Sequence, residues 1–201
     1  MLTLKVLGLV LAAAILTVVA RVTLGPDLRP YGTGPEERVS AGSYGERSGP
    51  YVTANYSAYD GAAPQLGDIV VVRPPVGDGL APACGSPPPT GAMCATPMSG
   101  RGRPDYLNRV VGLPGDRLSL RGGRVIRNGH VLDEPYARPC TGDDCDYPRT
   151  ITVLPDTYYA LSDDRRQEGD SRWWGPVPRR AVLARIDHCV PLIRLFCHAK
   201  T

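Results

Sequence analysis

The chain has 201 residues, of which 42% are hydrophobic and 21% are charged. These values fit one folded domain and exclude a chain that is disordered throughout. The formal net charge is only +3, and no long run of Lys or Arg is present, so the sequence gives no indication of nucleic-acid binding. Gly (23 residues) and Pro (21 residues) are abundant, which argues against a helical bundle and favours an all-β body with long loops.

The N-terminus carries an unbroken apolar run, residues 6–20, directly after Lys5. A helix of this length spans about 22 Å, and the flanking residues extend it toward a membrane span. Two interpretations are open. Residues 1–21 form one retained transmembrane helix with Lys5 on the cytoplasmic side, or they are a signal peptide cleaved after the small residues Val18 and Ala20. The retained anchor is favoured, and both interpretations place the rest of the chain outside the cytoplasm.

Six cysteines fall into three pairs that are close in sequence. Behind an export signal, an even and paired set is typical of disulfides. Zinc binding is the alternative, but the sequence contains no CxxC, so we expect no metal site. The disulfide candidates are Cys84, Cys94, Cys140, Cys145, Cys189 and Cys197. Their expected role is to fasten loops rich in Gly and Pro.

After a polar juxtamembrane segment, residues 22–50, with little expected regular structure, strand signals become dense. We expect a β domain over residues 51–190 and a tail over 191–201. Gly122-Gly123 and Asn128-Gly129 separate short alternating runs and predict hairpin turns. The expected strands cover 68–73, 107–111, 118–120, 124–126, 130–132, 151–154, 157–161 and 181–186.

Three separated blocks carry a resemblance to a known family. They are GDIVVV at 67–72, YLNRVVGLPGD at 106–116, and DDR followed by DSRWWGPVP between 163 and 178. In this order they resemble the type I (leader) signal peptidases. The resemblance implies a β domain with a hairpin extension, held outside the cytoplasm by a single-pass membrane anchor that contacts lipid. It also implies exported precursor proteins or their signal peptides as partners, and no cofactor.

The family's members use a serine nucleophile and a lysine general base. Serine is a poor nucleophile until a neighbour removes its proton, and a desolvated lysine can do so near neutral pH. The run RVSAGSY at 38–44 resembles the family's R-V-P-S-G-S-M, so Ser43 is the candidate nucleophile. Tyr44 replaces Met, and the Pro-Thr that follows in the family is absent. Ser57, which lies closer to the strand at Gly67, is a weaker candidate.

The position of the general-base lysine is held by Asn108. A neutral amide cannot take a proton from an alcohol at a useful rate. The chain has only two lysines, Lys5 before the apolar run and Lys200 at the penultimate position. Histidine is not expected to supply the general base either. His130 lies on a predicted hairpin, and His188 and His198 follow the last predicted strand.

The last block is also altered. Ser162 and Asp164 replace the family's Gly and Asn, and Glu168 stands where a serine usually orients the lysine. Asp170 and Arg172 are kept and are expected to form a structural ion pair near the site, with Arg109 of the central block close by. The other acidic residues here, Asp163 and Asp164, are expected to form solvated ion pairs with neighbouring arginines.

These observations predict a signal-peptidase-like pseudoenzyme, with scaffold kept and catalytic residues lost. Two alternatives stay open. The first is an active signal peptidase with a non-standard base. The second is a chaperone or accessory factor that binds exported peptides through main-chain hydrogen bonds without cutting them.

Overall fold

The structure is a computed structural model, and it describes residues 28–31, 52–74, 84–97, 105–138, 140–142, 145–167 and 169–189. The expected membrane helix over 1–21, Ser43 and the tail over 191–201 lie outside these residues. Within the described ranges, no helix is long and apolar enough to cross a membrane.

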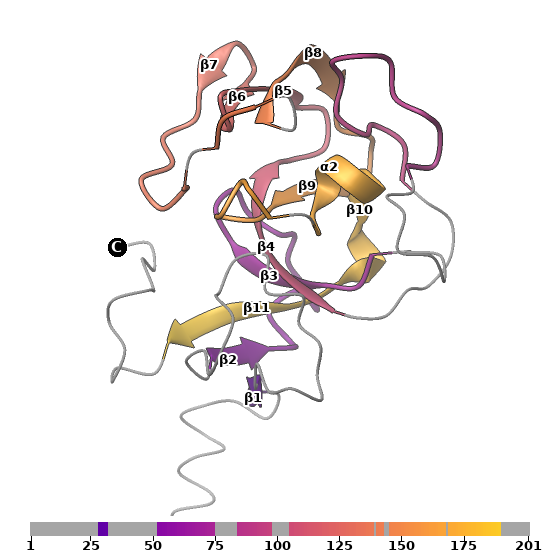
Figure 1. Cartoon of the computed structure of the whole chain (residues 1–201). Coiled ribbons are helices and arrows are strands. Elements are labelled where there is room, and N and C mark those ends of the chain that lie inside the picture. Colours follow the sequence, from indigo (N-terminus) through magenta and orange to yellow (C-terminus); the bar gives the residue numbers. More distant parts are fainter. Residues whose placement is uncertain are drawn as a thin grey trace, which may run out of the picture.

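Most of the described chain forms two antiparallel sheets (Figure 1). The larger one, here called the main sheet, has seven strands in the order β1-β2-β11-β3-β4-β9-β10. Its strands are β1 (Leu28–Tyr31), β2 (Val52–Asn55), β11 (Val182–Cys189), β3 (Ile69–Val72), β4 (Tyr106–Gly112), β9 (Thr157–Leu161) and β10 (Val177–Pro178).

The second sheet, here called the small sheet, is the expected hairpin extension. It has four strands in the order β7-β6-β5-β8. They are β7 (His130–Val131), β6 (Arg124–Arg127), β5 (Arg117–Arg121) and β8 (Tyr147–Thr152). In Figure 1 the small sheet lies at one end of the molecule, and β1 and β2 lie at the opposite end.

The main sheet is covered on both faces, which explains the unbroken β-branched run of β3. Val70 and Val72 pack into one apolar cluster with Val110 and Trp174, whereas Val71 packs on the other face with Leu107. Successive side chains of a strand point to opposite faces, so a strand buried on both sides needs apolar residues at every position. A further cluster, which includes Leu118 and Leu120, lies beneath the small sheet.

Most expected strands are confirmed to within two residues at each end, and the strand over 157–161 is confirmed as predicted. The strand expected at 151–154 instead runs from Tyr147 to Thr152, where it pairs with β5 through an irregular register. The prediction of little regular structure over 22–50 was wrong at β1. This edge strand contains Pro30, which an edge tolerates, and it was missed because its four residues show no alternation.

The hairpin turns are confirmed at both expected places. Asn128 and Gly129 have φ values of 54° and 87°, and Gly122 and Gly123 have 54° and 74°. Positive φ at both central residues matches the twist of the flanking strands, and Asn and Gly adopt it at low cost. The turn chemistry therefore fixes the register of the small sheet.

Asp116 joins the turn after β4 to the turn after β6. One carboxylate oxygen accepts hydrogen bonds from the Leu113 N–H (2.7 Å) and from Arg127 Nε (2.6 Å). The other accepts one from Asn128 Nδ2 (2.7 Å). Burial alone would raise the pKa of this carboxyl, but the hydrogen bonds from Arg127, Leu113 and Asn128 outweigh it and lower the pKa below its usual 3.8.

A lowered pKa in the folded state means that Asp116 stabilises the fold above pH 3.8 and that this contribution is lost as the pH falls through the folded-state pKa. We therefore predict that Asp116→Asn lowers the free energy of unfolding at pH 7 by about 2 kcal/mol. Wild type and variant should converge as the pH falls below 3.8 and through the folded-state pKa of Asp116. Urea unfolding at several pH values tests this, with the exposed Asp133→Asn as control. A gap that stays constant with pH would contradict it.

Two of the three expected disulfides lie in the described residues, and both are confirmed: Cys84–Cys94 and Cys140–Cys145. The first closes a loop that contains Ala92, and Ala92 forms an isolated β-bridge with Arg149 of β8. The second lies beside the β5–β6 turn, where the Gly123 N–H donates to the Cys145 carbonyl (2.9 Å). The third pair includes Cys197, which is outside the described residues, so it stays a prediction.

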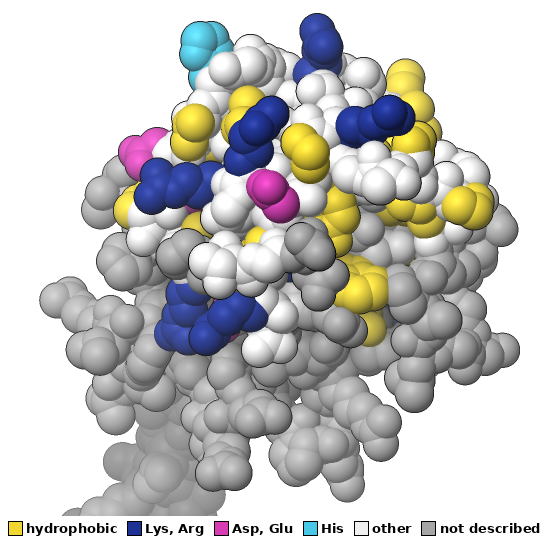
Figure 2. Space-filling view, turned by 45° about the horizontal axis from the view of Figure 1, so that its top comes forward, with side chains coloured by type: hydrophobic (Ala, Val, Ile, Leu, Met, Phe, Trp, Pro, Cys, Tyr) yellow, Lys and Arg dark blue, Asp and Glu magenta, His cyan; other side chains and the backbone are white. Residues whose placement is uncertain are grey.

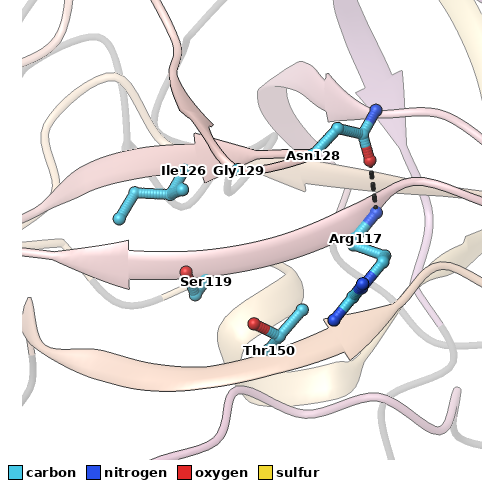
Figure 3. Close-up of a pocket in the computed structure, with 6 residues that line it drawn as sticks. All are labelled: Arg117, Ser119, Ile126, Asn128, Gly129 and Thr150. Atoms are coloured by element: carbon cyan, nitrogen blue, oxygen red, sulfur yellow. Dashed lines mark hydrogen bonds between the residues drawn. The ribbon is translucent and has the colours of Figure 1, made fainter.

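The outer face of the small sheet is exposed at Arg117, Arg121, Arg124 and Thr150, whereas Ser119 between them is only 6% exposed. Figure 2 brings this end of the molecule forward and shows more dark blue (Lys, Arg) than magenta (Asp, Glu) side chains on it. A hollow of about 280 Å³ opens on this face between β5, β6 and β8. Figure 3 shows its lining residues: Arg117, Ser119, Ile126, Asn128, Gly129 and Thr150.

Candidate functional site

Asn108, which the sequence resemblance predicts to stand at the family's lysine position, lies in the middle of the main sheet. It sits on β4 opposite Val70 of β3. Because side chains alternate along a strand, it shares a face with Tyr106 and Val110, which pack into the apolar cluster around Trp174. Asn108 is only 1% exposed. A side chain at this position is therefore desolvated, as the family's mechanism requires of its lysine.

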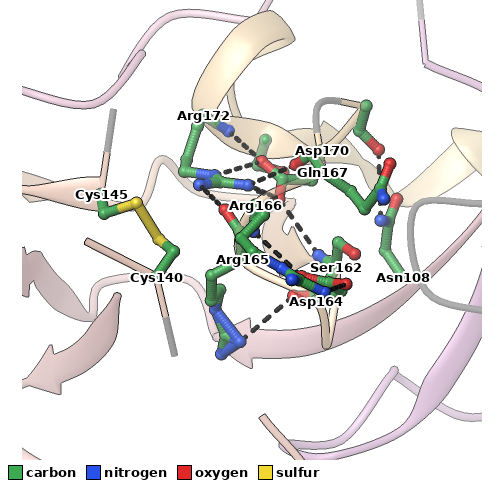
Figure 4. Close-up of polar contacts among 12 residues, drawn as sticks. Asn108, Cys140, Cys145, Ser162, Asp164, Arg165, Arg166, Gln167, Asp170 and Arg172 are labelled. Carbon is green, nitrogen blue, oxygen red and sulfur yellow. Dashed lines mark hydrogen bonds and ion pairs between the residues drawn. A yellow bond between two sulfur atoms is a disulfide. The ribbon is translucent and has the colours of Figure 1, made fainter. Parts of the chain in front are cut away.

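The Asn108 amide has one hydrogen bond within the described residues. Its Nδ2 donates to the Gly169 carbonyl at 3.2 Å, next to Asp170 (Figure 4). Its Oδ1 is buried and has no hydrogen-bond partner among the described residues. An orphaned buried carbonyl oxygen is uncommon and costs stability. Asn108 is thus a neutral group whose amide is only half satisfied by the residues that the structure describes.

Arg109, the next residue of β4, points to the opposite face. Its guanidinium forms two parallel hydrogen bonds with Asp163, from Nε at 2.9 Å and from Nη2 at 2.8 Å. Nη1 donates to the Gly67 carbonyl at 3.0 Å, and the guanidinium carbon lies 3.8 Å from the centre of the Tyr136 ring. One side chain therefore ties β4 to the loop after β9 and to the turn before β3.

Asp170 and Arg172 form the expected ion pair, and it is buried. Asp170 is fully buried and accepts hydrogen bonds from Arg172 Nη2 (2.8 Å) and Nε (2.9 Å), as well as from the Ser162 N–H (3.1 Å). Arg172 also donates to the Arg165 carbonyl (2.8 Å) and to the Gln167 carbonyl (2.6 Å). These contacts close the loop over 162–172 on itself (Figure 4).

Asp170 also begins the short helix α2 (Ser171–Trp174), where its side chain accepts the Arg172 N–H at 2.9 Å. This is the usual role of an Asp that precedes the first helical residue. The Ser171 hydroxyl accepts the Ala160 N–H of β9 at 3.0 Å. The helix is thereby held against the main sheet beside the Asn108 face.

The expectation that Asp163 and Asp164 form solvated pairs was only partly correct. Asp164 does pair with exposed Arg166 (2.6 Å), and the hydrogen bond from Arg166 lowers the pKa of Asp164. Asp163 pairs with Arg109, as described above. Arg165 is buried and pairs instead with Glu134, whose other carboxylate oxygen accepts the Val125 N–H of β6 at 3.2 Å. Sequence reasoning missed the pair of Arg165 and Glu134.

Gly175, directly after α2, packs against the loop of the first disulfide. Its φ is +82°, and a Cβ placed there would lie 2.6 Å from the Thr96 carbonyl oxygen and 3.0 Å from Cys94 Sγ. Glycine is therefore required for backbone conformation and for space. The Cys84–Cys94 disulfide helps to hold that loop in place, and with it the end of the last sequence block.

We predict that Gly175→Ala lowers the free energy of unfolding by about 3 kcal/mol, through backbone strain and the steric clash together. Gly115→Ala is the matched control, because Gly115 has a similar φ of +88° and no atom within 4 Å of its added Cβ. That variant should cost about 1 kcal/mol. Equal losses in urea unfolding would show that the contact with the disulfide loop is not tight.

Of the two candidate nucleophiles, only Ser57 lies in the described residues. It lies two residues after the end of β2, and both its N–H (3.1 Å) and its hydroxyl (3.0 Å) donate to Asn55 Oδ1. The strand register places Asn55, Arg185, Val70 and Asn108 in one row across β2, β11, β3 and β4. At about 4.8 Å per strand, Asn55 and Asn108 are roughly 14 Å apart.

The histidines give no base at this site within the described residues. His130 is exposed on β7 of the small sheet, which is not part of the main sheet that carries Asn108. His188 lies on β11 opposite Thr53 of β2. His198, Lys5, Lys200 and Glu168 lie outside the described residues.

Comparison with known proteins assigns the family. The model of the family described as "Signal peptidase, peptidase S26" matches residues 4–190, which is more than half of the chain. The chain belongs to this family, and the expectation drawn from the three sequence blocks is confirmed. The two sheets and the buried ion pairs described above are therefore features of a signal peptidase family member.

The chain resembles individual members over shorter stretches. It is 37% identical over 81 residues to "Signal peptidase I" from Leptolyngbya laminosa, which covers 40% of this chain and 38% of that protein. It is 34% identical over 94 residues to "Signal peptidase I" from Bacillus caldolyticus. This match covers 41% of this chain and 52% of that protein. The chain thus spans about a third to a half of these relatives. A crystal structure of a signal peptidase I from Enterococcus faecalis V583 matches 62% of this chain and 97% of that one, with 21% identity and a TM-score of 0.41.

Proposed function

We propose that this chain is a membrane-anchored, extracytoplasmic member of the signal peptidase family whose peptidase activity is lost or much reduced. The observation that carries the proposal is Asn108, a buried neutral amide at the position of the general base. Without a group that takes the proton of the serine hydroxyl, the attack on the peptide carbonyl is slower by about 10²–10⁴-fold.

The scaffold around this position is intact, which supports a role that still depends on its shape. The pair of Arg109 and Asp163 and the pair of Asp170 and Arg172 keep their full sets of hydrogen bonds. The partners we propose are exported precursor proteins or their signal peptides, in line with the family and with the names of the relatives. Residues 1–21 would anchor the domain by a single span through the lipid.

The alternative of an active peptidase needs a base from elsewhere in the chain. Lys200, the only lysine beyond residue 5, is the amine that would have to reach the site. The alternative of an accessory factor needs only peptide binding. A cleavage assay distinguishes an active peptidase from our proposal. A binding assay with the same precursor detects an accessory factor.

The test uses the full-length chain in detergent with a radiolabelled exported precursor that an active family member cleaves. We predict no cleavage above the protein-free background, and no change for Ser43→Ala or Ser57→Ala. Retention of the precursor on the immobilised chain, competed by its synthetic signal peptide, would identify the accessory role. Cleavage that either alanine variant abolishes would overturn the proposal.

A further inference from the structure

The outer face of the small sheet carries an unbalanced positive charge. Arg117, Ser119 and Arg121 of β5 point outward, because Leu118 and Leu120 between them are fully buried in the core below. Arg124 of β6 lies directly opposite Arg121. Among the ion pairs of the described residues, none involves Arg117, Arg121 or Arg124, whereas seven other arginines each pair with a carboxylate.

The facing pair Arg121 and Arg124 is unfavourable for the fold itself. Like charges directly opposite each other in a sheet are destabilising. An anionic partner bound between them would convert this repulsion into attraction. The positive face of Figure 2 is therefore better suited to binding an anion than to stabilising the sheet.

The hollow on the same face provides hydrogen-bond donors for one anionic group. Figure 3 shows the Arg117 guanidinium and the hydroxyls of Ser119 and Thr150 on the same side of the strands. No hydrogen bond of either hydroxyl is present within the part of the chain that the structure describes. Ile126, which pairs with Ser119, adds an apolar wall. A carboxylate on a short aliphatic stem, as in Asp or Glu, fits this combination of donors and apolar surface.

The spacing of the arginines indicates an extended peptide. Arg117 and Arg121 are four residues apart on one strand, which corresponds to about 13 Å. An extended polypeptide covers the same distance in four residues, so carboxylates at positions i and i+4 would reach the hollow and the Arg121–Arg124 pair. A bilayer surface fits less well, because the small sheet lies at the opposite end of the molecule from β1, which follows the apolar run over 6–20 closely in sequence (Figure 1).

We propose that the outer face of the small sheet is a docking surface for an acidic stretch of extended polypeptide. One carboxylate binds in the hollow at Arg117, Ser119 and Thr150, and a second binds between Arg121 and Arg124. This inference goes beyond the proposed function, because it holds whether or not the chain cleaves peptides.

The test is fluorescence anisotropy of the full-length chain in detergent with a labelled peptide that carries Glu at positions i and i+4. We expect saturable binding that weakens with salt, and none for the peptide with Gln at both positions. Arg117→Gln should weaken binding about tenfold, through loss of charge-assisted hydrogen bonds. Arg180→Gln removes the same charge from another exposed arginine without an ion pair in the described residues, and it should change affinity little.

Arg121→Gln distinguishes a loss of binding from a loss of folding. It should weaken peptide binding while raising the thermal midpoint slightly, because it removes the like-charge pair. Three outcomes would overturn the proposal: equal weakening by Arg117→Gln and Arg180→Gln, equal binding of the Gln peptide, or binding only to vesicles of anionic lipid.

Discussion

Replacing Asn108 with lysine should create cleavage of an exported precursor where the wild-type chain has none. Position 108 is buried on the apolar face with Val70 and Val110, so a lysine there would be desolvated and its pKa would fall toward neutrality. The Gly169 carbonyl, which now accepts the Asn108 amide, would accept from the ammonium. We expect cleavage about 10²–10⁴-fold above the protein-free background, the usual contribution of a positioned general base.

Asn108→Gln is the matched control, because it lengthens the side chain but keeps a neutral amide. It should remain inactive. Adding Ser43→Ala or Ser57→Ala to Asn108→Lys then identifies the nucleophile by loss of the new activity. If Asn108→Lys folds with an unfolding midpoint near that of wild type and still cleaves nothing, the missing base is not the reason for inactivity.

Removing the charge of Arg172 should cause the largest loss of stability among single substitutions near the site. Asp170 is fully buried, and without Arg172 its carboxyl group would lose its ion-pair partner and keep only backbone N–H donors. Breaking a buried pair in this way costs about 3–5 kcal/mol. We predict this loss for Arg172→Met in urea unfolding followed by the fluorescence of adjacent Trp173 and Trp174.

Arg166→Met provides the control for Arg172→Met. Arg166 also pairs with an aspartate, Asp164, but its side chain is 61% exposed. Surface pairs of this kind contribute little because water screens the charges. A similar loss of stability in both variants would contradict the special role of the buried pair.

The local features of this fold are predictable from the sequence. Gly122-Gly123 and Asn128-Gly129 specify hairpin turns by chemistry contained in two residues, and both hairpins are present. The unbroken apolar run of β3 likewise predicts a strand buried on both faces. The first two disulfides follow from cysteine pairs that are close in sequence.

Features that depend on tertiary packing were not predictable in the same way. Arg165 has four acidic residues within five positions of it, yet it pairs with Glu134, 31 residues away, because the small sheet brings Glu134 against the loop. Strands β1 and β2 carry too few alternating residues to be recognised, and they become strands by pairing with each other and with β11. Asp170 is buried because its loop closes around it, and its neighbours in the sequence do not predict this burial.

The same distinction between local sequence and tertiary packing applies to the candidate site. The lysine position is predicted from the block that surrounds it, and this block, YLNRVVGLPGD, forms one strand and its following turn. The unsatisfied Oδ1 of Asn108 and the contact of its amide with Gly169 could not be predicted, because Gly169 is 61 residues away in sequence.

The most direct test of the missing general base is a single-turnover pH–rate profile of the wild-type full-length chain, in excess over precursor, from pH 6 to pH 10. We predict that cleavage stays at the protein-free background at every pH, because no side chain at the site takes up the serine proton. A rate that rises with pH through a single pKa, and that is lost in Lys200→Met or in a histidine variant, would show that another residue acts as the base.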